Sequence, residues 1–181
     1  MEQLSLLALS GSLRKTSYNT YAIKALKALA PDHVNITIGK IEALPLFNPD
    51  REYDDIPALA KLKSELKRSS GLIIATPEYA HGISGPMKNA LDWLVSGDEF
   101  PYKPIMLINT SPRASHAQQA LIEVLTTMSG NVIQTSGVSI PLLSSDLDVD
   151  GIVANREIAN ALLAGLDTFY SEIVKSRTDS N

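Results

Sequence analysis

A polar segment near the start of the chain has the side chains needed to hold an anion. It runs from Ser10 to Asn19 and joins the apolar stretch 4–9 to a segment whose apolar residues recur at helical spacing. The first N–H groups of a helix have no helical acceptor and lie at the positive end of its dipole, so they attract anions. Arg14 can donate hydrogen bonds to two phosphate oxygens at once. The other donors are the hydroxyls of Ser12, Thr16 and Ser17 and the amide of Asn19. The segment therefore predicts a site for a phosphate monoester.

The same segment also has a purely structural interpretation. Thr16 or Ser17 can cap the helix, with Arg14 and Lys15 simply in solvent. Two familiar nucleotide loops are excluded, because neither a Gly-x-Gly-x-x-Gly fingerprint nor a Gly-Lys-Ser/Thr ending follows the apolar stretch. A phosphate bound here would belong to a mononucleotide.

A second candidate loop follows the apolar run Gly71–Ala75. It starts at Thr76, carries exposed polar and aromatic groups, and leads into an amphipathic helix. Loops of this kind lie at the carboxyl ends of parallel strands, where open α/β sheets bind their ligands. Gly82 and Gly85 permit a ligand to approach the backbone closely. We therefore expect this loop and the first to share one ligand.

Both loops require a scaffold of alternating strands and helices, and the apolar periodicity predicts one. The expected strands are 4–9, 34–38, 72–75, 105–109 and 132–134, with an extension of the last through Val138 and Ile140 as an open alternative. The expected helices start at Ser17 and after Pro57, and then cover 85–95, 115–128 and 152–173. This alternation predicts a three-layer α/β fold, a doubly wound five-stranded parallel sheet of flavodoxin-like type with strand order 2-1-3-4-5. We expect one domain over residues 1–175 and a disordered tail over 176–181.

Composition limits the function classes. The 181 residues are 44% hydrophobic and 20% charged, as in ordinary soluble globular proteins, and no apolar run reaches the length of a membrane span. A net charge of −4 gives no reason to expect nucleic acid. The start of the chain lacks the features of a signal peptide, so we expect a cytoplasmic protein. Because the chain has no cysteine, any redox chemistry must come from a bound cofactor, and no thiolate metal site is expected.

The two loops together resemble a known family, the NAD(P)H-dependent FMN reductases. Residues 12–19 resemble its phosphate loop, Ser-x-Arg-x-x-Ser-x-Asn, and residues 77–93 resemble its second flavin loop, Pro-Glu-Tyr-(variable)-Lys-Asn-Ala-Leu-Asp-Trp. The resemblance implies FMN as bound cofactor and NADPH or NADH as co-substrate. It implies that the phosphate loop binds through Ser10, Ser12, Arg14, Ser17, Tyr18 and Asn19. It implies that the flavin contacts Pro77, Glu78, Tyr79, Ala80, His81, Gly82, Ile83 and Ser111.

Some positions depart from the family pattern. Ala80 stands where asparagine is frequent in the family, and the third loop, which follows strand 105–109, lacks the glycines expected there. Ser111 and Arg113 are its candidate flavin contacts, whereas Ser115 is equally suited to cap the next helix.

Several side chains near the second loop have more than one interpretation. His81 can point into the nicotinamide or substrate pocket, donate a proton to a reduced quinone, or cover a subunit contact. Lys88 and Asn89 can anchor the loop, and with Asp92 they can equally brace their own helix. Trp93 fits the core or an interface better than a place on the flavin.

The resemblance implies an FMN-containing oxidoreductase that reduces a flavin, quinone, azo compound or metal oxyanion by ping-pong hydride transfer. No catalytic side chain is required, because the flavin carries the chemistry. Two other classes remain open: a flavodoxin-type electron carrier, and an FMN-binding regulatory protein with little turnover. A homodimer or homotetramer is also implied. The apolar positions of helix 85–95 suit either a subunit contact or the core.

Overall fold

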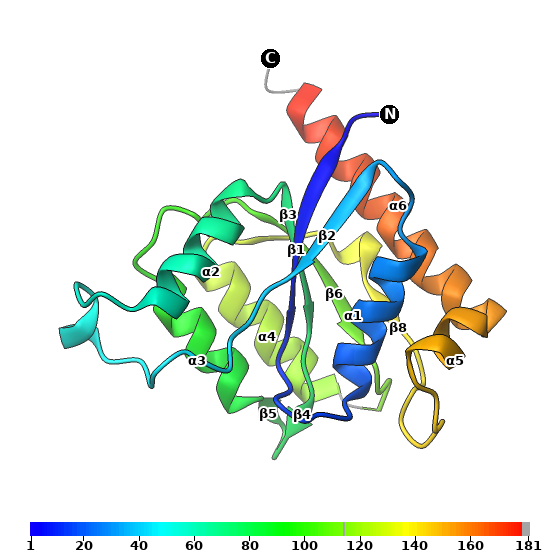
Figure 1. The fold of residues 1–181 in the computed structure, drawn as a ribbon, viewed down its shortest axis with the longest axis horizontal. Helices are drawn as coiled ribbons and strands as arrows, with labels where there is room; N and C mark the ends of the chain where they lie inside the picture. The colour runs from blue at the N-terminus through cyan, green and yellow to red at the C-terminus, as the bar shows by residue number, and fades with distance from the viewer. Residues whose placement is uncertain (114, 179–181) are drawn as a thin grey trace.

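The computed structural model describes residues 1–113 and 115–178 and shows a parallel sheet between two layers of helices (Figure 1). The strands of this sheet are β1 (Leu4–Ser10), β2 (Val34–Ile38), β3 (Gly71–Ala75), β6 (Pro104–Asn109), β7 (Asn131–Val132) and β8 (Val138–Ser139). The helices are α1 (Tyr18–Leu29), α2 (Pro57–Arg68), α3 (Gly85–Leu94), α4 (Ser115–Thr127), α5 (Val149–Ala154) and α6 (Arg156–Thr178), with 3₁₀ turns η1 (Pro49–Arg51) and η2 (Gln134–Ser136). A separate hairpin consists of β4 (Glu78–Tyr79) and β5 (Gly82–Ile83).

The strand order confirms the doubly wound topology. β1 lies between β2 and β3, β6 follows β3, and β7 and β8 both pair with β6, all in parallel. The register places Ser10 beside Ala75, so β1 and β3 end at the same edge of the sheet. The loops that follow these two strands therefore start side by side, as a ligand site at a carboxyl edge requires.

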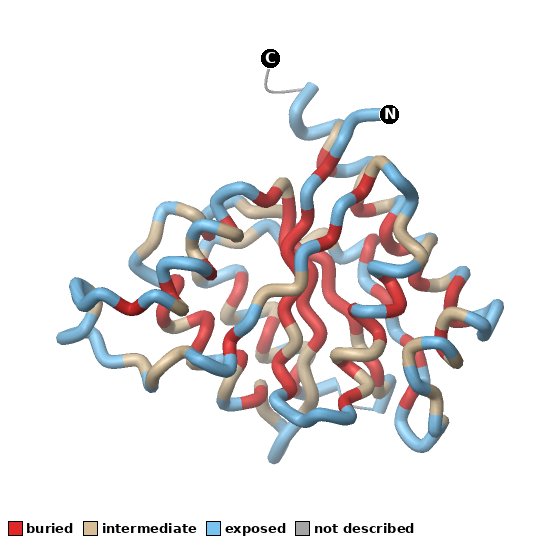
Figure 2. The backbone as a smooth tube through the Cα atoms, in the orientation of Figure 1, coloured by how far each residue is buried: buried red, intermediate tan, exposed pale blue. Residues whose placement is uncertain are grey.

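The alternation of side chains along β1 divides the core into two layers. Leu6 and Ala8 pack with α1 and α6, whereas Leu7 and Leu9 pack with α2, α3 and α4. Figure 2 shows the buried chain concentrated along the central strands. All five residues of β3 are buried, as expected for a strand covered on both faces.

At the fifth position of the sheet, the structure has two short strands where the sequence predicted a single strand. β7 and β8 are two short strands separated by η2, whose Ser136 is fully buried and donates its hydroxyl to the Ile133 carbonyl at 2.7 Å. α6 packs tightly on this turn, because a Cβ at Gly165 would lie 2.9 Å from the Ser136 carbonyl oxygen. Part of the expected strand is therefore a turn that packs against α6.

The last helical segment also differs from the single expected helix. α5 ends at Ala154, and the next residue, Asn155, has an extended backbone. The Asn155 side chain accepts the N–H of Ile158 at 3.1 Å at the start of α6. Asparagine favours such a cap over a helix interior. α6 then continues to Thr178, three residues into the expected tail, and residues 179–181 lie outside the described part of the chain.

The apolar face of α3 is largely taken up by the protein itself. Met87, Leu91, Trp93 and Leu94 are all buried, and Val95 is 58% exposed. The Trp93 indole donates to the Pro45 carbonyl at 2.8 Å, which fixes it in the core rather than at the flavin site. No helix within the described ranges is long and apolar enough to cross a bilayer.

Candidate functional site

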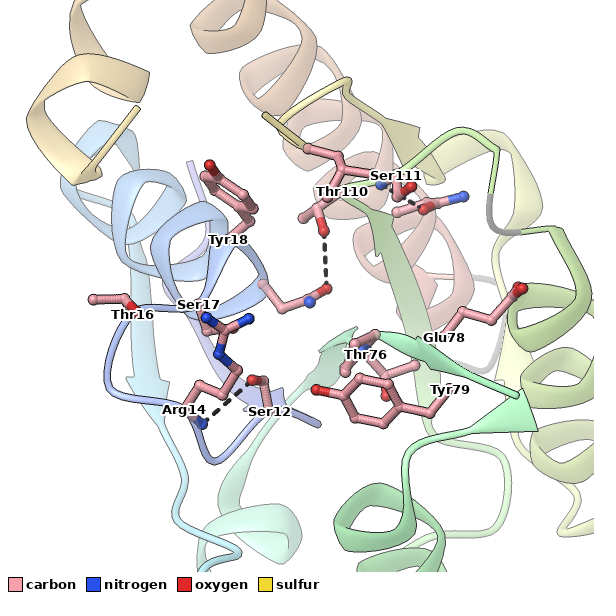
Figure 3. A pocket seen from close by; sticks show the side chains of 14 residues that line it. Ser12, Arg14, Thr16, Ser17, Tyr18, Thr76, Glu78, Tyr79, Thr110 and Ser111 are labelled. Atoms are coloured by element: carbon pink, nitrogen blue, oxygen red, sulfur yellow. Dashed lines mark hydrogen bonds between the residues drawn. The ribbon is translucent and has the colours of Figure 1, made fainter. Parts of the chain in front are cut away.

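Three loops at the carboxyl edge of the sheet enclose a cavity of about 230 Å³ (Figure 3). The first loop and the start of α1 contribute Ser12, Arg14, Thr16, Ser17, Tyr18 and Asn19. The loop after β3 contributes Thr76, Pro77, Glu78 and Tyr79, and the loop after β6 contributes Asn109, Thr110 and Ser111, with Leu143 beside them. The cavity therefore joins the two loops that the sequence predicted to share a ligand, and adds the third.

The first loop is shaped by hydrogen bonds between its own side chains and backbone. The Ser12 hydroxyl accepts the N–H of Arg14 at 3.4 Å, and the Ser17 hydroxyl accepts the N–H of Thr20 at 3.4 Å. Ser17 is thus the N-cap of α1, as the structural interpretation expected. Because Ser17 takes up only the N–H of Thr20, the N–H groups of Tyr18 and Asn19 are left without a helical acceptor. These N–H groups lie at the positive end of α1.

Within the cavity the charges around this helix end favour an anion, whereas Asp146 and Asp148 share a neighbouring pocket with Arg14. The first turn of α1 has no acidic residue. Among the described residues that line the cavity, Glu78 is the one acid, and Figure 3 shows it turned away from Arg14 toward α4. Within residues 1–113 and 115–178 no carboxylate forms an ion pair with Arg14. Its guanidinium is therefore available to a ligand.

The second loop is a tight hairpin in which Glu78 pairs with Ile83 and Tyr79 with Gly82. The two residues between them have positive φ angles, 49° at Ala80 and 59° at His81. Positive φ at both central positions is the type I′ arrangement that suits a two-residue hairpin. Tyr79 is half exposed, and its ring lies across the cavity with the hydroxyl toward Ser12 (Figure 3).

Glu78 joins the hairpin to the third loop region. Its Oε2 accepts the N–H of Ala117 in the first turn of α4 at 2.9 Å. A carboxylate at a helix start compensates both the free N–H groups and the dipole. α4 begins at Ser115 itself; Ala114, immediately before it, lies outside the described residues.

Further hydrogen bonds connect the three loops. Ser84 donates its hydroxyl to the Gly11 carbonyl at 2.6 Å, joining the second loop to the first. Thr110 donates to Asn19 Oδ1 at 3.1 Å, joining the third loop to α1. The walls of the cavity are therefore fixed relative to one another by the protein's own contacts, which reduces the ordering required when a ligand binds.

The structure brings most of the predicted residues to the cavity, but some lie elsewhere. Ser10 does not line it, because its hydroxyl shares a 2.8 Å hydrogen bond with Thr20. The far half of the second loop, Ala80, His81, Gly82 and Ile83, lies beyond the lining residues because the chain reverses after Tyr79. Asn89, a candidate anchor of the second loop or brace of its own helix, instead accepts the N–H of Phe47 at 2.7 Å and so holds the 44–48 segment. Lys88 and Asp92 form an ion pair on their own helix.

Four lining residues were not assigned from the sequence. Thr76, Asn109 and Thr110 lie at the ends of β3 and β6, and the rule that ligands bind at carboxyl ends of strands identifies such positions. Leu143 follows the divided fifth strand and had no such signal. Arg113, a candidate from the third loop, does not line the cavity.

These residues fit the phosphate end of a mononucleotide. Ser12, Ser17 and Asn19 are buried polar side chains gathered at the start of α1, and hydroxyl, amide and guanidinium groups are the donors that a phosphate monoester accepts. Tyr79, Pro77 and Leu143 add flat or apolar surface on the other side of the cavity. The donor set and the apolar wall suit FMN.

Comparison with known proteins gives the same family as the loop motifs. The family model described as NADPH-dependent FMN reductase matches residues 4–142. An NAD(P)H-dependent FMN reductase from Pseudomonas aeruginosa is 29% identical over 181 residues, covering 95% of this chain and 98% of the relative. A quinone reductase from Escherichia coli K12 is 32% identical over 115 residues, 61% of each chain.

A solved structure shows the same likeness in three dimensions. FerB, described as a flavoenzyme NAD(P)H:(acceptor) oxidoreductase from Paracoccus denitrificans, is 28% identical and superposes with a TM-score of 0.80. The match covers 95% of this chain and 98% of FerB. Since the family model spans more than half of the sequence, the chain belongs to the NADPH-dependent FMN reductase family, which confirms the expected oxidoreductase class and the expected use of FMN and NAD(P)H.

Proposed function

We propose that the chain binds FMN in the cavity between its three loops and reduces a quinone or flavin with NAD(P)H. The observation that carries the proposal is the start of α1, where Arg14 has no carboxylate partner among the described residues and the first helical turn has no acid. In this proposal the phosphate is held by Arg14, Ser12 and Ser17 together with the N–H groups of Tyr18 and Asn19.

The opposite side of the cavity would hold the flavin ring. Pro77, Tyr79, Ser111 and Leu143 provide apolar surface and a polar edge there. Glu78 would act indirectly, since its carboxylate is already bonded to the N–H of Ala117. Contacts from the expected residues Ala80, His81, Gly82 and Ile83 require a ring that extends past Tyr79 to the hairpin tip.

The chemistry that FMN supplies when bound is acceptance of a hydride from the nicotinamide and delivery of two electrons to an acceptor. The chain's part is to hold the cofactor and to leave one face accessible. Tyr79 and Leu143, 52% and 64% exposed, lie at the mouth of the cavity, so the face near them is open to solvent. Donor and acceptor would use this face in turn, and we therefore expect ping-pong kinetics.

A spectrum followed by anaerobic reduction tests the proposal. The purified protein, incubated with FMN and desalted, should be yellow, and NADPH or NADH added under nitrogen should bleach the flavin band promptly. Addition of menadione or free FMN should then restore it. A bound flavin that stays oxidised would contradict the reductase and favour the electron carrier; prompt reduction with negligible turnover of any acceptor would favour the regulatory protein. A colourless protein would exclude all three.

Initial rates identify the kinetic order and the acceptor. Double-reciprocal plots at several acceptor concentrations should give parallel lines, whereas intersecting lines would show that donor and acceptor bind together. A panel of quinones, free flavins, azo compounds and chromate should rank quinones and flavins first, in keeping with the names of the relatives.

The expected homodimer or homotetramer belongs to the same proposal, as does the cytoplasm, where NAD(P)H is available. Support for an oligomer comes from large apolar side chains left in solvent near α3, namely Leu46, Tyr53 and Val95. Light scattering coupled to gel filtration measures the mass directly. A monomer at micromolar concentration would contradict the oligomer without affecting the flavin site.

A further inference from the structure

The turn of the β4–β5 hairpin is formed by two residues that disfavour its conformation. Ala80 and His81 both have positive φ angles, and neither is glycine. A side chain with a Cβ atom resists the left-handed region, so such a turn persists only where its surroundings hold it. The contacts around the hairpin must supply that support.

Two contacts connect the hairpin to the first turn of α4. At the base, the Glu78 carboxylate accepts the N–H of Ala117 at 2.9 Å. At the tip, the His81 ring stacks on the ring of His116, with 4.3 Å between centroids and 16° between planes. Both strands of the hairpin pack on α4. The helix therefore holds the hairpin at both ends.

Tyr79 lies between these two contacts and forms part of the cavity wall. His116 does not line the cavity, and its ring contacts the hairpin at His81. We propose that His116 is a positioning residue: its stacking on His81 holds Tyr79 in place for the flavin, and the two rings separate when both are protonated. The inference rests on the proposed function, because it concerns the same cavity.

One negative group lies near the two rings: the Glu78 carboxylate, which keeps its charge while it accepts the N–H of Ala117, beside His116. The charged and titratable groups on the hairpin and on α4 with its preceding loop are Glu78, Tyr79, Arg113 and Glu123. The Glu78 carboxylate is bonded to the Ala117 N–H, and the first turn of α4 has no acid. The start of a helix is itself positive. Two unit positive charges 4.3 Å apart in water weaken an equilibrium by at most about five-fold, because Glu78 offsets part of their repulsion.

Three variants separate stacking from protonation. His116→Ala removes the ring, His116→Phe keeps a ring that cannot be protonated, and His33→Ala is the control. His33 lies just before β2 and contacts Tyr170, so it belongs to the opposite edge of the sheet. FMN dissociation constants are measured by flavin fluorescence at pH 7.5 and pH 5.5. Each variant is compared with wild type at the same pH, so that the changing charge of the FMN phosphate cancels.

The expected results differ between the variants. His116→Ala weakens FMN binding about 2- to 10-fold at pH 7.5, the range for loss of one aromatic pair. His116→Phe binds like wild type at pH 7.5 and more tightly than wild type at pH 5.5, by at most about five-fold. His33→Ala matches wild type at both values. Wild-type behaviour of both His116 variants at both pH values would overturn the inference while leaving the proposed function intact.

A second measurement tests the stacking of His81 on His116 in the protein without FMN. Amide exchange protection of Tyr79 and Gly82, which pair in the hairpin, should fall between pH 7.5 and pH 5.5 in wild type and stay constant in His116→Phe. Equal protection in both proteins at both pH values would overturn the proton-sensitive contact. If wild type binds no FMN at all, the proposed function fails, and these exchange data still decide whether the contact exists.

Discussion

Replacing Arg14 by alanine should weaken FMN binding selectively, because it removes the guanidinium that contacts the phosphate in the proposed site. Within the described ranges its guanidinium has no ion-pair partner, and the loop is held through the Arg14 backbone N–H, which alanine retains. The substitution therefore leaves the shape of the loop in place. Any loss of affinity then reports on the ligand.

The magnitude follows from the exposure of the side chain. A hydrogen bond to a charged group contributes about 1.5–3 kcal/mol, and Arg14 is exposed to solvent, so the lower figure applies. We expect about 1.5 kcal/mol, which is about a ten-fold increase in the FMN dissociation constant. Riboflavin, which lacks the phosphate, should bind equally to wild type and Arg14→Ala. The advantage of FMN over riboflavin should also shrink as salt is raised.

Lys15→Ala provides the matched control. Lys15 is the neighbouring cation, is exposed, and does not line the cavity, so its removal should change FMN affinity less than two-fold. Both ligands are titrated against the three proteins by calorimetry at fixed ionic strength. An equal loss of FMN and riboflavin in Arg14→Ala would show that Arg14 acts through loop shape. An unchanged FMN affinity would place the phosphate elsewhere.

Further substitutions test the packing that holds the site. Gly11→Ala should lower the free energy of unfolding in urea by about 1–3 kcal/mol, because its Cβ would lie 2.7 Å from the Thr76 Cβ; an unchanged midpoint would mean that the loops move apart easily. Ala80→Gly should raise the unfolding free energy by about 1 kcal/mol, since glycine tolerates the φ of 49°, and a loss of stability would exclude strain at the turn. Burial, and secondly the charge of Arg177, lowers the pKa of Lys103 below 10.5. Between that lowered pKa and pH 10.5 the unfolded chain binds more protons than the folded chain, so the free energy of unfolding rises with pH. Lys103→Met should flatten that rise in urea titrations, and an unaltered pH slope would refute the assignment.

Local sequence signals were sufficient for the parts of the fold that depend on one segment at a time. β1 and β3 are continuous apolar runs, and each ends in a polar turn before a helix, so their position and their shared edge follow from pattern and handedness. Ser17 as a helix cap likewise depends only on residues within one turn. The position of the site followed from these elements.

Features that depend on distant segments were not predictable in this way. The turn η2, which divides the fifth strand, packs closely on α6 at Gly165, and the pattern of residues 131–140 carries no sign of that helix. Leu143, which lines the cavity, follows this divided strand and lies far from the other lining residues in the sequence. The same limit applies to the Glu78 and Ala117 contact, which joins residues 39 positions apart.

Residues within one motif can have different roles, and only their hydrogen-bond partners in the structure distinguish these roles. Ser10, Asn19 and Glu78 belong to the motifs, yet Ser10 bonds to Thr20, Asn19 accepts from Thr110, and Glu78 accepts from the start of α4. A side chain already satisfied by the protein gains little from a ligand, since the bond to the ligand replaces one that is already made. Arg14 has no such ion-pair partner among the described residues, and an exposed cation gains a bidentate contact when a phosphate arrives. Losses at Ser10 or Glu78 should therefore appear first in the stability of the protein, whereas the loss at Arg14 should appear in FMN affinity. Asn19 uses only its Oδ1 in the bond with Thr110, so its amide nitrogen can still donate to a ligand.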